Sequence, residues 1–180
     1  TIPTEHERKY ALLIDSLEEV QNRASEVYLM RQGYLAFAKG MAVRIRMEEP
    51  VDCPKKPKYK LCVKQKVSGR VIEVEKNIDK RDFDDLWEVT MNRLEKIRYV
   101  VEAGAYSWEI DYFQDHGETY FCLAECELPE GQAEPKKIPQ FIQKHLLFEV
   151  PLHNDNYSSK RLACLKHAKK LYKELLEQNT

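Results

Sequence analysis

Pairs of charged side chains two residues apart recur along this sequence, and most pairs carry charges of one sign. A strand places residues i and i+2 on the same face, roughly 6.6 to 7 Å apart, so each pair points both of its charges in one direction. Paired carboxylates suit a hard divalent cation, and paired guanidinium or ammonium groups suit phosphate oxygens. The pairs are Glu5-x-Glu7-x-Lys9, Arg44-x-Arg46, Glu73-x-Glu75, Lys96-x-Arg98, Glu109-x-Asp111 and Glu125-x-Glu127.

Each pair taken alone is typical of the solvated face of a sheet. Like charges side by side destabilise a sheet, however, unless a counter-charge or a metal ion lies between them. The intervening residues are mostly apolar, as at Ile45, Val74, Ile97 and Ile110. A closed β-barrel with a polar lumen is the simplest fold that encloses the charged face. The combination therefore predicts a charged lumen suited to metal ions and polyanions.

The elements that position these pairs are mostly strands, separated by turn signals such as Lys39-Gly40 and Ser68-Gly69. Amphipathic helices are expected at 79–91 and at about 158–177, and a further helical stretch is expected after an N-cap at Asp15 or Ser16. Strands are expected at about 5–13, 27–48 (a hairpin), 59–66, 70–78, 94–102, 105–113 and 118–128. This α+β pattern predicts one domain, residues 1–180, built on an eight-stranded antiparallel β-barrel with flanking helices.

Charge and cysteine content narrow the classes of partner. Lys and Arg total 29 against 30 Asp and Glu, so the protein has no large positive net charge that would attract nucleic acid or an anionic membrane. No stretch approaches the roughly 18 apolar residues of a membrane span, and no signal pattern opens the chain, so we expect a cytoplasmic protein. The 5 cysteines are odd in number and lack CxxC spacing, which indicates reduced packing thiols rather than disulfides or zinc ligands.

At Glu5-His6-Glu7-Arg8-Lys9 the sequence resembles the ExExK signature of the CYTH domain, found in the triphosphate tunnel metalloenzymes. The resemblance covers about residues 5–160. It implies an eight-stranded antiparallel tunnel that binds a triphosphate and a divalent metal, usually magnesium or manganese. It continues in order through Gln32-Gly33-Tyr34-Leu35, Val43-Arg44-Ile45-Arg46, Arg70-Val71-Ile72-Glu73-Val74-Glu75, Lys96-Ile97-Arg98-Tyr99, Trp108-Glu109-Ile110-Asp111 and Leu123-Ala124-Glu125-Cys126-Glu127-Leu128.

The resemblance also implies roles for the charged residues. The metal carboxylates would be Glu5, Glu7, Glu125 and Glu127, and together with Lys9 these would form the catalytic set. The substrate-binding basic groups would be Lys9, Arg44, Arg46, Lys64, Lys96 and Arg98. Glu73 and Glu75, with Glu109 and Asp111, would complete the lumen as further acids or as partners that keep the basic side chains extended. The segment 151–160 departs from the family's usual acidic-Arg-Tyr-Ser-Asn run, which leaves the roles of Lys160 and Arg161 undefined.

These residues favour an enzyme that hydrolyses a small-molecule triphosphate, most simply inorganic tripolyphosphate, by attack of a metal-activated water. Three alternatives stay open at this stage. A class IV adenylate cyclase would convert ATP to cyclic AMP and pyrophosphate, a thiamine triphosphatase would release thiamine diphosphate, and a binding module would hold a triphosphate or nucleotide without turning it over. We expect a monomer or a homodimer and no nucleic-acid or membrane partner.

Overall fold

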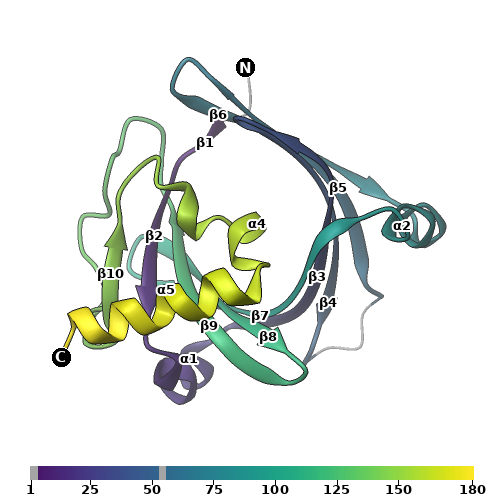
Figure 1. Ribbon diagram of the computed structural model, residues 1–180. Helices are drawn as coiled ribbons and strands as arrows, with labels where there is room; N and C mark the ends of the chain where they lie inside the picture. The colour runs from purple at the N-terminus through teal and green to yellow at the C-terminus, as the bar shows by residue number, and fades with distance from the viewer. Residues whose placement is uncertain (1–3, 53–55) are drawn as a thin grey trace.

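The computed structural model describes residues 4–52 and 56–180, and for Thr4 and Glu5 the backbone only. Strands dominate the chain, and short helices flank them (Figure 1). In chain order the elements are β1 (Thr4–Glu5), β2 (Glu7–Leu12), η1 (Ile14–Ser16), α1 (Leu17–Arg23), β3 (Glu26–Ala38), β4 (Met41–Pro50), β5 (Lys58–Val67), β6 (Arg70–Ile78), α2 (Lys80–Trp87), β7 (Met91–Ala103), β8 (Tyr106–Asp115), β9 (Glu118–Glu127), α3 (Gln140–Lys144), β10 (Leu146–Val150), η2 (Asp155–Tyr157), α4 (Ser159–Leu162) and α5 (Leu165–Gln178).

The strands form one antiparallel sheet that curls round a central axis (Figure 1). Its 10 strands run in the order β1-β6-β5-β4-β3-β7-β8-β9-β2-β10. Because β1 pairs with β6 and β2 pairs with β9, the segment Thr4–Leu12 joins the two ends of the curved sheet, although the β1–β6 contact is short. If β1 and β2 count as one strand interrupted at His6, and β10 is set aside as an addition beside β2, the predicted eight-stranded antiparallel tunnel with flanking helices is confirmed.

Apolar residues that alternate with the charged pairs form the outer face of the sheet. Tyr10 and Trp108 belong to a cluster that packs against Val20 of α1 and Ile142 of α3. Ile45, Met47 and the partly buried Tyr59 pack in the same way against α2 through Phe83. A third cluster, the α4–α5 cluster, lies on the opposite, inner face: Phe121 and Leu123, which share a face with Glu125, pack with Leu162, Ala168 and Leu175 and join α4 and α5 to one part of the tunnel. Since α1 and α2 cover the outer face, the charged residues between these apolar positions face inward.

Three expected elements differ from the structure. The helix expected at 79–91 ends at Trp87, because strand β7 already begins at Met91. The terminal helix is broken at Cys164, whose extended backbone (φ −80°, ψ 105°) redirects the chain so that both Leu162 and Ala168 reach the same core cluster. Ser16 occupies the N-cap position of α1 as expected, but its hydroxyl bonds to the Tyr112 hydroxyl at 2.7 Å and not to the helix backbone.

The helices are short, and none of those that the structure describes combines the length and the apolar content of a membrane-crossing helix.

Gly33 allows the closest approach between β3 and the α2–β7 connection. A Cβ atom at this position would lie 2.7 Å from Cβ and 2.9 Å from Cγ2 of Thr90. We therefore expect Gly33→Ala to lower the free energy of unfolding by about 1–3 kcal/mol, as overpacking of a core does. Chemical denaturation would measure this, with Ala36→Ser at an exposed position of the same strand as control. Equal stability of the two variants would contradict the steric role of Gly33.

Candidate active site

Strand register brings the predicted charged residues to the inner face of the sheet. Arg44 on β4 lies opposite Cys62 on β5, which lies opposite Glu75 on β6. The same geometry continues on the other side of the tunnel, where Arg98 lies opposite Asp111. The further inward pairs are Lys64 with Glu73, Glu109 with Glu125, Lys9 with Glu125 and Glu7 with Glu127. Glu5 pairs through its backbone with Val71, and its side chain lies outside the described residues.

On strands β4 to β6, two bases and two acids form a compact network. Arg46 contacts Glu48 at 2.7 Å and Glu75 at 3.5 Å, and Lys60 contacts the same carboxylates at 3.3 and 3.0 Å. Arg46 is only 8% exposed, so these acids hold its charge in place inside the fold. Glu48 and Lys60 were not among the predicted site residues. Their spacing of two from Arg46 and Cys62 is the sequence signal that places them on this face.

A second group lies next to this network. Glu73 is 3.9 Å from Arg44 and 3.8 Å from Lys64, and it accepts a hydrogen bond from the Cys62 thiol at 3.4 Å. Burial raises the pKa of that thiol to about 11, and the neighbouring Glu73 adds to the effect, so Cys62 is a neutral donor here and not a nucleophile. Ligand atoms of Cys62, Glu73 and Glu75 lie within 4.8 Å of one another, the one such group among the described residues.

Across the tunnel, Asp111 organises two buried cations. It is fully buried and accepts bonds from Lys96 Nζ at 2.7 Å and from Arg98 Nε and Nη2 at 2.7 and 2.9 Å. Arg98 also pairs with Glu109. Burial alone would raise the pKa of the Asp111 carboxyl, but Arg98 and Lys96 outweigh it and hold that pKa well below its usual range. Asp111 is therefore a fixed carboxylate that keeps both basic side chains in position.

The remaining acids differ from Asp111 because they lie opposite other carboxylates. Glu109 lies opposite Glu125, and Glu7 opposite Glu127, so carboxylates oppose carboxylates on adjacent strands. Burial raises the pKa of Glu125, Glu7 adds to the rise, and Lys9 opposes it. Burial likewise raises the pKa of Glu127, and Glu109 and Glu7 reinforce this. Such a set of closely spaced oxygen ligands fits a hard divalent cation, which would relieve the repulsion between them.

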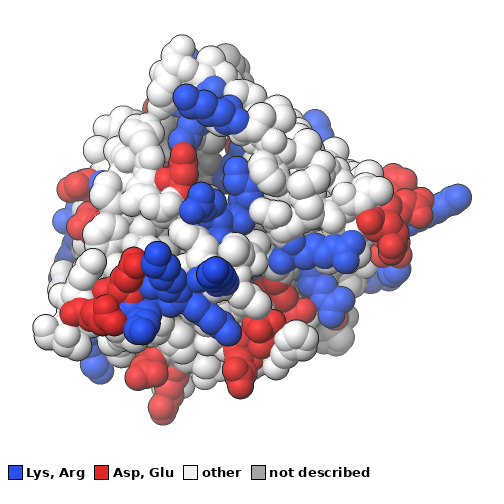
Figure 2. All heavy atoms as spheres, viewed as in Figure 1, with Lys and Arg blue, Asp and Glu red and all other residues white. Residues whose placement is uncertain are grey.

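The two halves of the inner face act on each other. The carboxylate of Glu73 contributes to the raised pKa of Glu127, and Arg46 helps to lower the pKa of Lys96. Figure 2 shows the molecule hollowed near the middle of one face, with basic and acidic side chains gathered at the opening. The arrangement is a mixed-charge tunnel whose bases suit phosphate oxygens and whose acids suit a cation.

The divergent segment 151–160 lies against this structure. Asp155 of η2 pairs with Lys66 of β5 at 3.1 Å, and Lys160 Nζ lies 4.5 Å from the ring centroid of Phe37 on β3. Tyr157 is buried among the residues of the α4–α5 cluster. The segment therefore links the C-terminal helices to strands β3 and β5, and Lys160 contacts an aromatic ring.

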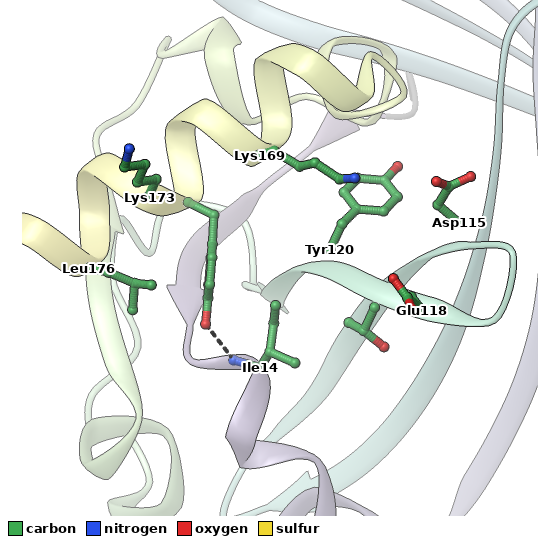
Figure 3. A pocket seen from close by; sticks show the side chains of 9 residues that line it. Ile14, Asp115, Glu118, Tyr120, Lys169, Lys173 and Leu176 are labelled. Carbon is green, nitrogen blue, oxygen red and sulfur yellow. Dashed lines mark hydrogen bonds between the residues drawn. The ribbon is translucent and has the colours of Figure 1, made fainter.

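A separate cavity of about 230 Å³ lies between α5 and the β8–β9 turn (Figure 3). Its lining mixes Lys169 and Lys173 with Asp115 and Glu118, and the Ile14 backbone N–H donates to the Tyr172 hydroxyl beside it at 3.1 Å. The lining includes none of the predicted site residues. Its balanced charges give no preference for an anion or a cation.

Lys96 gives the tunnel a testable pH dependence. Burial lowers the pKa of its ammonium group to about 8, with Asp111 opposing the shift and Arg98 adding to it. The group is charged below this pH and neutral above it, so affinity for tripolyphosphate is expected to fall as pH rises through about 8. Calorimetric titration with tripolyphosphate at pH values from about 6.5 to about 9.5, which bracket this pKa, would measure the change in affinity. In Lys96→Arg the fall should vanish, because a guanidinium stays charged. The same fall in both proteins would contradict this assignment.

Comparison with known proteins relates the chain to phosphate chemistry. No family model matches the sequence. The chain is 30% identical over 131 residues to an inorganic triphosphatase of Acetivibrio thermocellus, an alignment that covers 71% of this chain and 78% of that protein.

Solved structures share the fold. The crystal structure of the hypothetical protein NE1496 matches with a TM-score of 0.55 and 26% identity, over 89% of this chain and 97% of that one. A Bacillus halodurans protein provisionally described as an adenylate cyclase matches with a TM-score of 0.54 and 16% identity, over 73% of this chain and 82% of that one. At such low identity, this second similarity shows the fold alone.

Proposed function

The chain belongs to the CYTH family of triphosphate tunnel metalloenzymes, and we propose that it hydrolyses inorganic tripolyphosphate with a divalent metal ion, magnesium or manganese. The proposal rests chiefly on one observation: the inner face holds buried cations that carboxylates fix in place, beside carboxylates that lie opposite other carboxylates on adjacent strands and whose pKa values are raised. The similarity to the triphosphatase of Acetivibrio thermocellus supports it.

In this proposal the bases bind the substrate. A tripolyphosphate carries several negative charges, and phosphoryl transfer depends mainly on positioning and on stabilising charge at the phosphate oxygens. Asp111 and Glu75 hold their basic partners extended before the substrate arrives, which lowers the cost of organising them on binding. The bases that bind phosphate oxygens are Lys9, Arg44, Arg46, Lys64, Lys96 and Arg98, with Glu73 and Glu75 as their supporting acids.

The carboxylates Glu5, Glu7, Glu125 and Glu127 would hold the metal. A bound divalent cation neutralises phosphate charge and makes water a better nucleophile at neutral pH. Glu125 also suits the role of a base that orients this water, because its raised pKa lies closer to neutrality than that of an ordinary carboxyl. Glu125 lies opposite Lys9 on one neighbouring strand and opposite Glu109 on the other, so it is next to both a substrate-binding base and a further acid of the tunnel.

The proposal is tested by phosphate release. Purified protein is incubated with tripolyphosphate, ATP or thiamine triphosphate, each with magnesium, with manganese and with chelator. Orthophosphate from tripolyphosphate that requires metal is the expected result. Cyclic AMP from ATP would replace the proposal by a cyclase, and thiamine diphosphate as the main product would change the substrate. Tight binding of tripolyphosphate without any turnover would indicate a binding module instead.

A further inference from the structure

Two buried polar residues of β3 have no part in the scheme above. Gln32 lies directly opposite Arg46, and Tyr34 directly opposite Arg44, so each faces one guanidinium from the neighbouring strand. Gln32 is 0% exposed and Tyr34 is 3% exposed. Their side chains are joined by a hydrogen bond from Gln32 Nε2 to Tyr34 Oη of 3.1 Å. They form a buried neutral pair alongside both arginines.

Arg44 has a phenol as well as an acid beside it. The phenol interacts with the Arg44 guanidinium, and Glu73, the carboxylate paired with that group, lies 3.9 Å away. The Tyr34 ring is held by edge-on packing against Phe37, with centroids 6.5 Å apart. Arg44 is thus bordered by an immobilised phenol as well as by an acid.

Gln32 and Arg46 carry complementary groups that lack partners. Gln32 Oε1 is buried without a hydrogen-bond partner, and so are Nε of Arg46 and Nε of Arg44. An unpaired buried polar group costs about 1–3 kcal/mol, so this juxtaposition of one acceptor with two donors is seldom retained without a use. The strand register places this acceptor and the Arg46 donor on directly opposed residues.

We propose that Gln32 and Tyr34 are positioning residues that aim Arg46 and Arg44 at the bound triphosphate, an inference that rests on the proposed function. Carboxylates can also orient arginines, but they cancel part of the positive charge that attracts the substrate. A neutral amide and phenol orient the guanidinium groups and leave their charge available to the phosphates. The pair therefore complements the acids Glu73 and Glu75.

The test removes single polar groups and follows substrate affinity. Tyr34→Phe and Gln32→Met keep the apolar volume, and each should raise KM for tripolyphosphate about 10-fold, in keeping with the loss of a hydrogen bond to a charged group, with kcat nearly unchanged. Tyr112→Phe is the matched control, since its buried hydroxyl bonds Ser16 on the outer side of the sheet. That control should lose stability without a change in KM.

Crossed double variants separate positioning from a general structural effect. Tyr34→Phe should add nothing to Arg44→Ala but should retain its full effect beside Arg46→Ala, and Gln32→Met should show the reverse pattern. Additive effects in all combinations, or a KM change in Tyr112→Phe as large as that in Tyr34→Phe, would overturn the inference.

Calorimetry that measures tripolyphosphate binding in the presence of chelator, and therefore without metal-dependent turnover, tests this inference separately from the proposed function. Weaker binding in Tyr34→Phe would support positioning even in a protein that turns nothing over. Equal binding in the wild type and both single variants would overturn the inference while leaving hydrolysis intact. A wild type that neither binds nor cleaves tripolyphosphate would overturn both.

Discussion

Replacing Glu125 with glutamine is expected to lower kcat for tripolyphosphate hydrolysis by about 100- to 1,000-fold, the size of loss seen when one group that stabilises the transition state is removed. Glutamine keeps the shape of the side chain but cannot be an anionic metal ligand or accept a proton from water. The fold should survive, because Glu125 lies among other carboxylates and its loss relieves repulsion from Glu7. Thermal denaturation should therefore show an unchanged or higher melting temperature.

The matched control for this change is Glu118→Gln, at the exposed start of the same strand. Wild-type turnover is expected there. Calorimetric titration with manganese distinguishes the two roles of Glu125: weaker metal binding indicates a ligand, and intact metal binding with lost turnover indicates the base that orients water. Turnover in Glu125→Gln equal to that of the control would remove Glu125 from the site altogether.

Acidity should affect the same set of residues. The pKa values of Glu109, Glu125 and Glu127 are all raised, first by burial and then by neighbouring acids, although Arg98 opposes the rise at Glu109. A carboxylate with a raised pKa takes up a proton at a higher pH than an ordinary one, and a metal must displace that proton. As the pH falls, these carboxylates are therefore expected to lose metal affinity at a higher pH than exposed carboxylates would.

The inward face of the tunnel could be predicted from sequence because it depends on a local rule. Residues two apart on a strand share a face, and this alone places Arg44 with Arg46 and Lys96 with Arg98. Which strands lie side by side depends on contacts between distant segments, and the sequence carries no equally simple signal for them. The resemblance to a known family implied an antiparallel tunnel, but the order of the strands in the sheet comes from the structure.

Other features could not be predicted, for identifiable reasons. The opposition of Glu109 to Glu125 depends on the register of β8 against β9, where a shift by one residue would turn one of them outward. The broken C-terminal helix has no proline or glycine at Cys164 to announce it, and only tertiary packing of Leu162 and Ala168 on one cluster explains the break. Gln32 and Tyr34 lie in a stretch that carries the family resemblance, but they lack charge, so a search for charged pairs assigned them no role.

Asp111→Asn is expected to cause the largest loss of stability. Asp111 is fully buried and bonds Lys96 and Arg98 through three contacts between 2.7 and 2.9 Å. Asparagine has nearly the same shape, but it is neutral and replaces one acceptor oxygen by a donor amide, which faces cationic donors. Removing one partner of a buried ion pair typically costs about 3–5 kcal/mol. In a chain of this size, roughly 2–4 °C of melting temperature accompanies each kcal/mol, so a decrease of about 6–20 °C is expected.

The pH dependence of this loss follows from the lowered pKa of Asp111. Its stabilising charge is fully present above the ordinary pKa of an unfolded aspartate, about 3.9, and is lost only as the pH falls through the lower folded value. The difference in melting temperature between wild type and Asp111→Asn should therefore be constant near neutral pH and shrink in strong acid. Asp84→Asn, which removes an exposed partner of Lys80, is the control and should melt close to the wild type. If the two variants melted alike, Asp111 would not be the buried anchor of the basic groups, and other contacts, such as that of Arg98 with Glu109, would have to hold them in the tunnel.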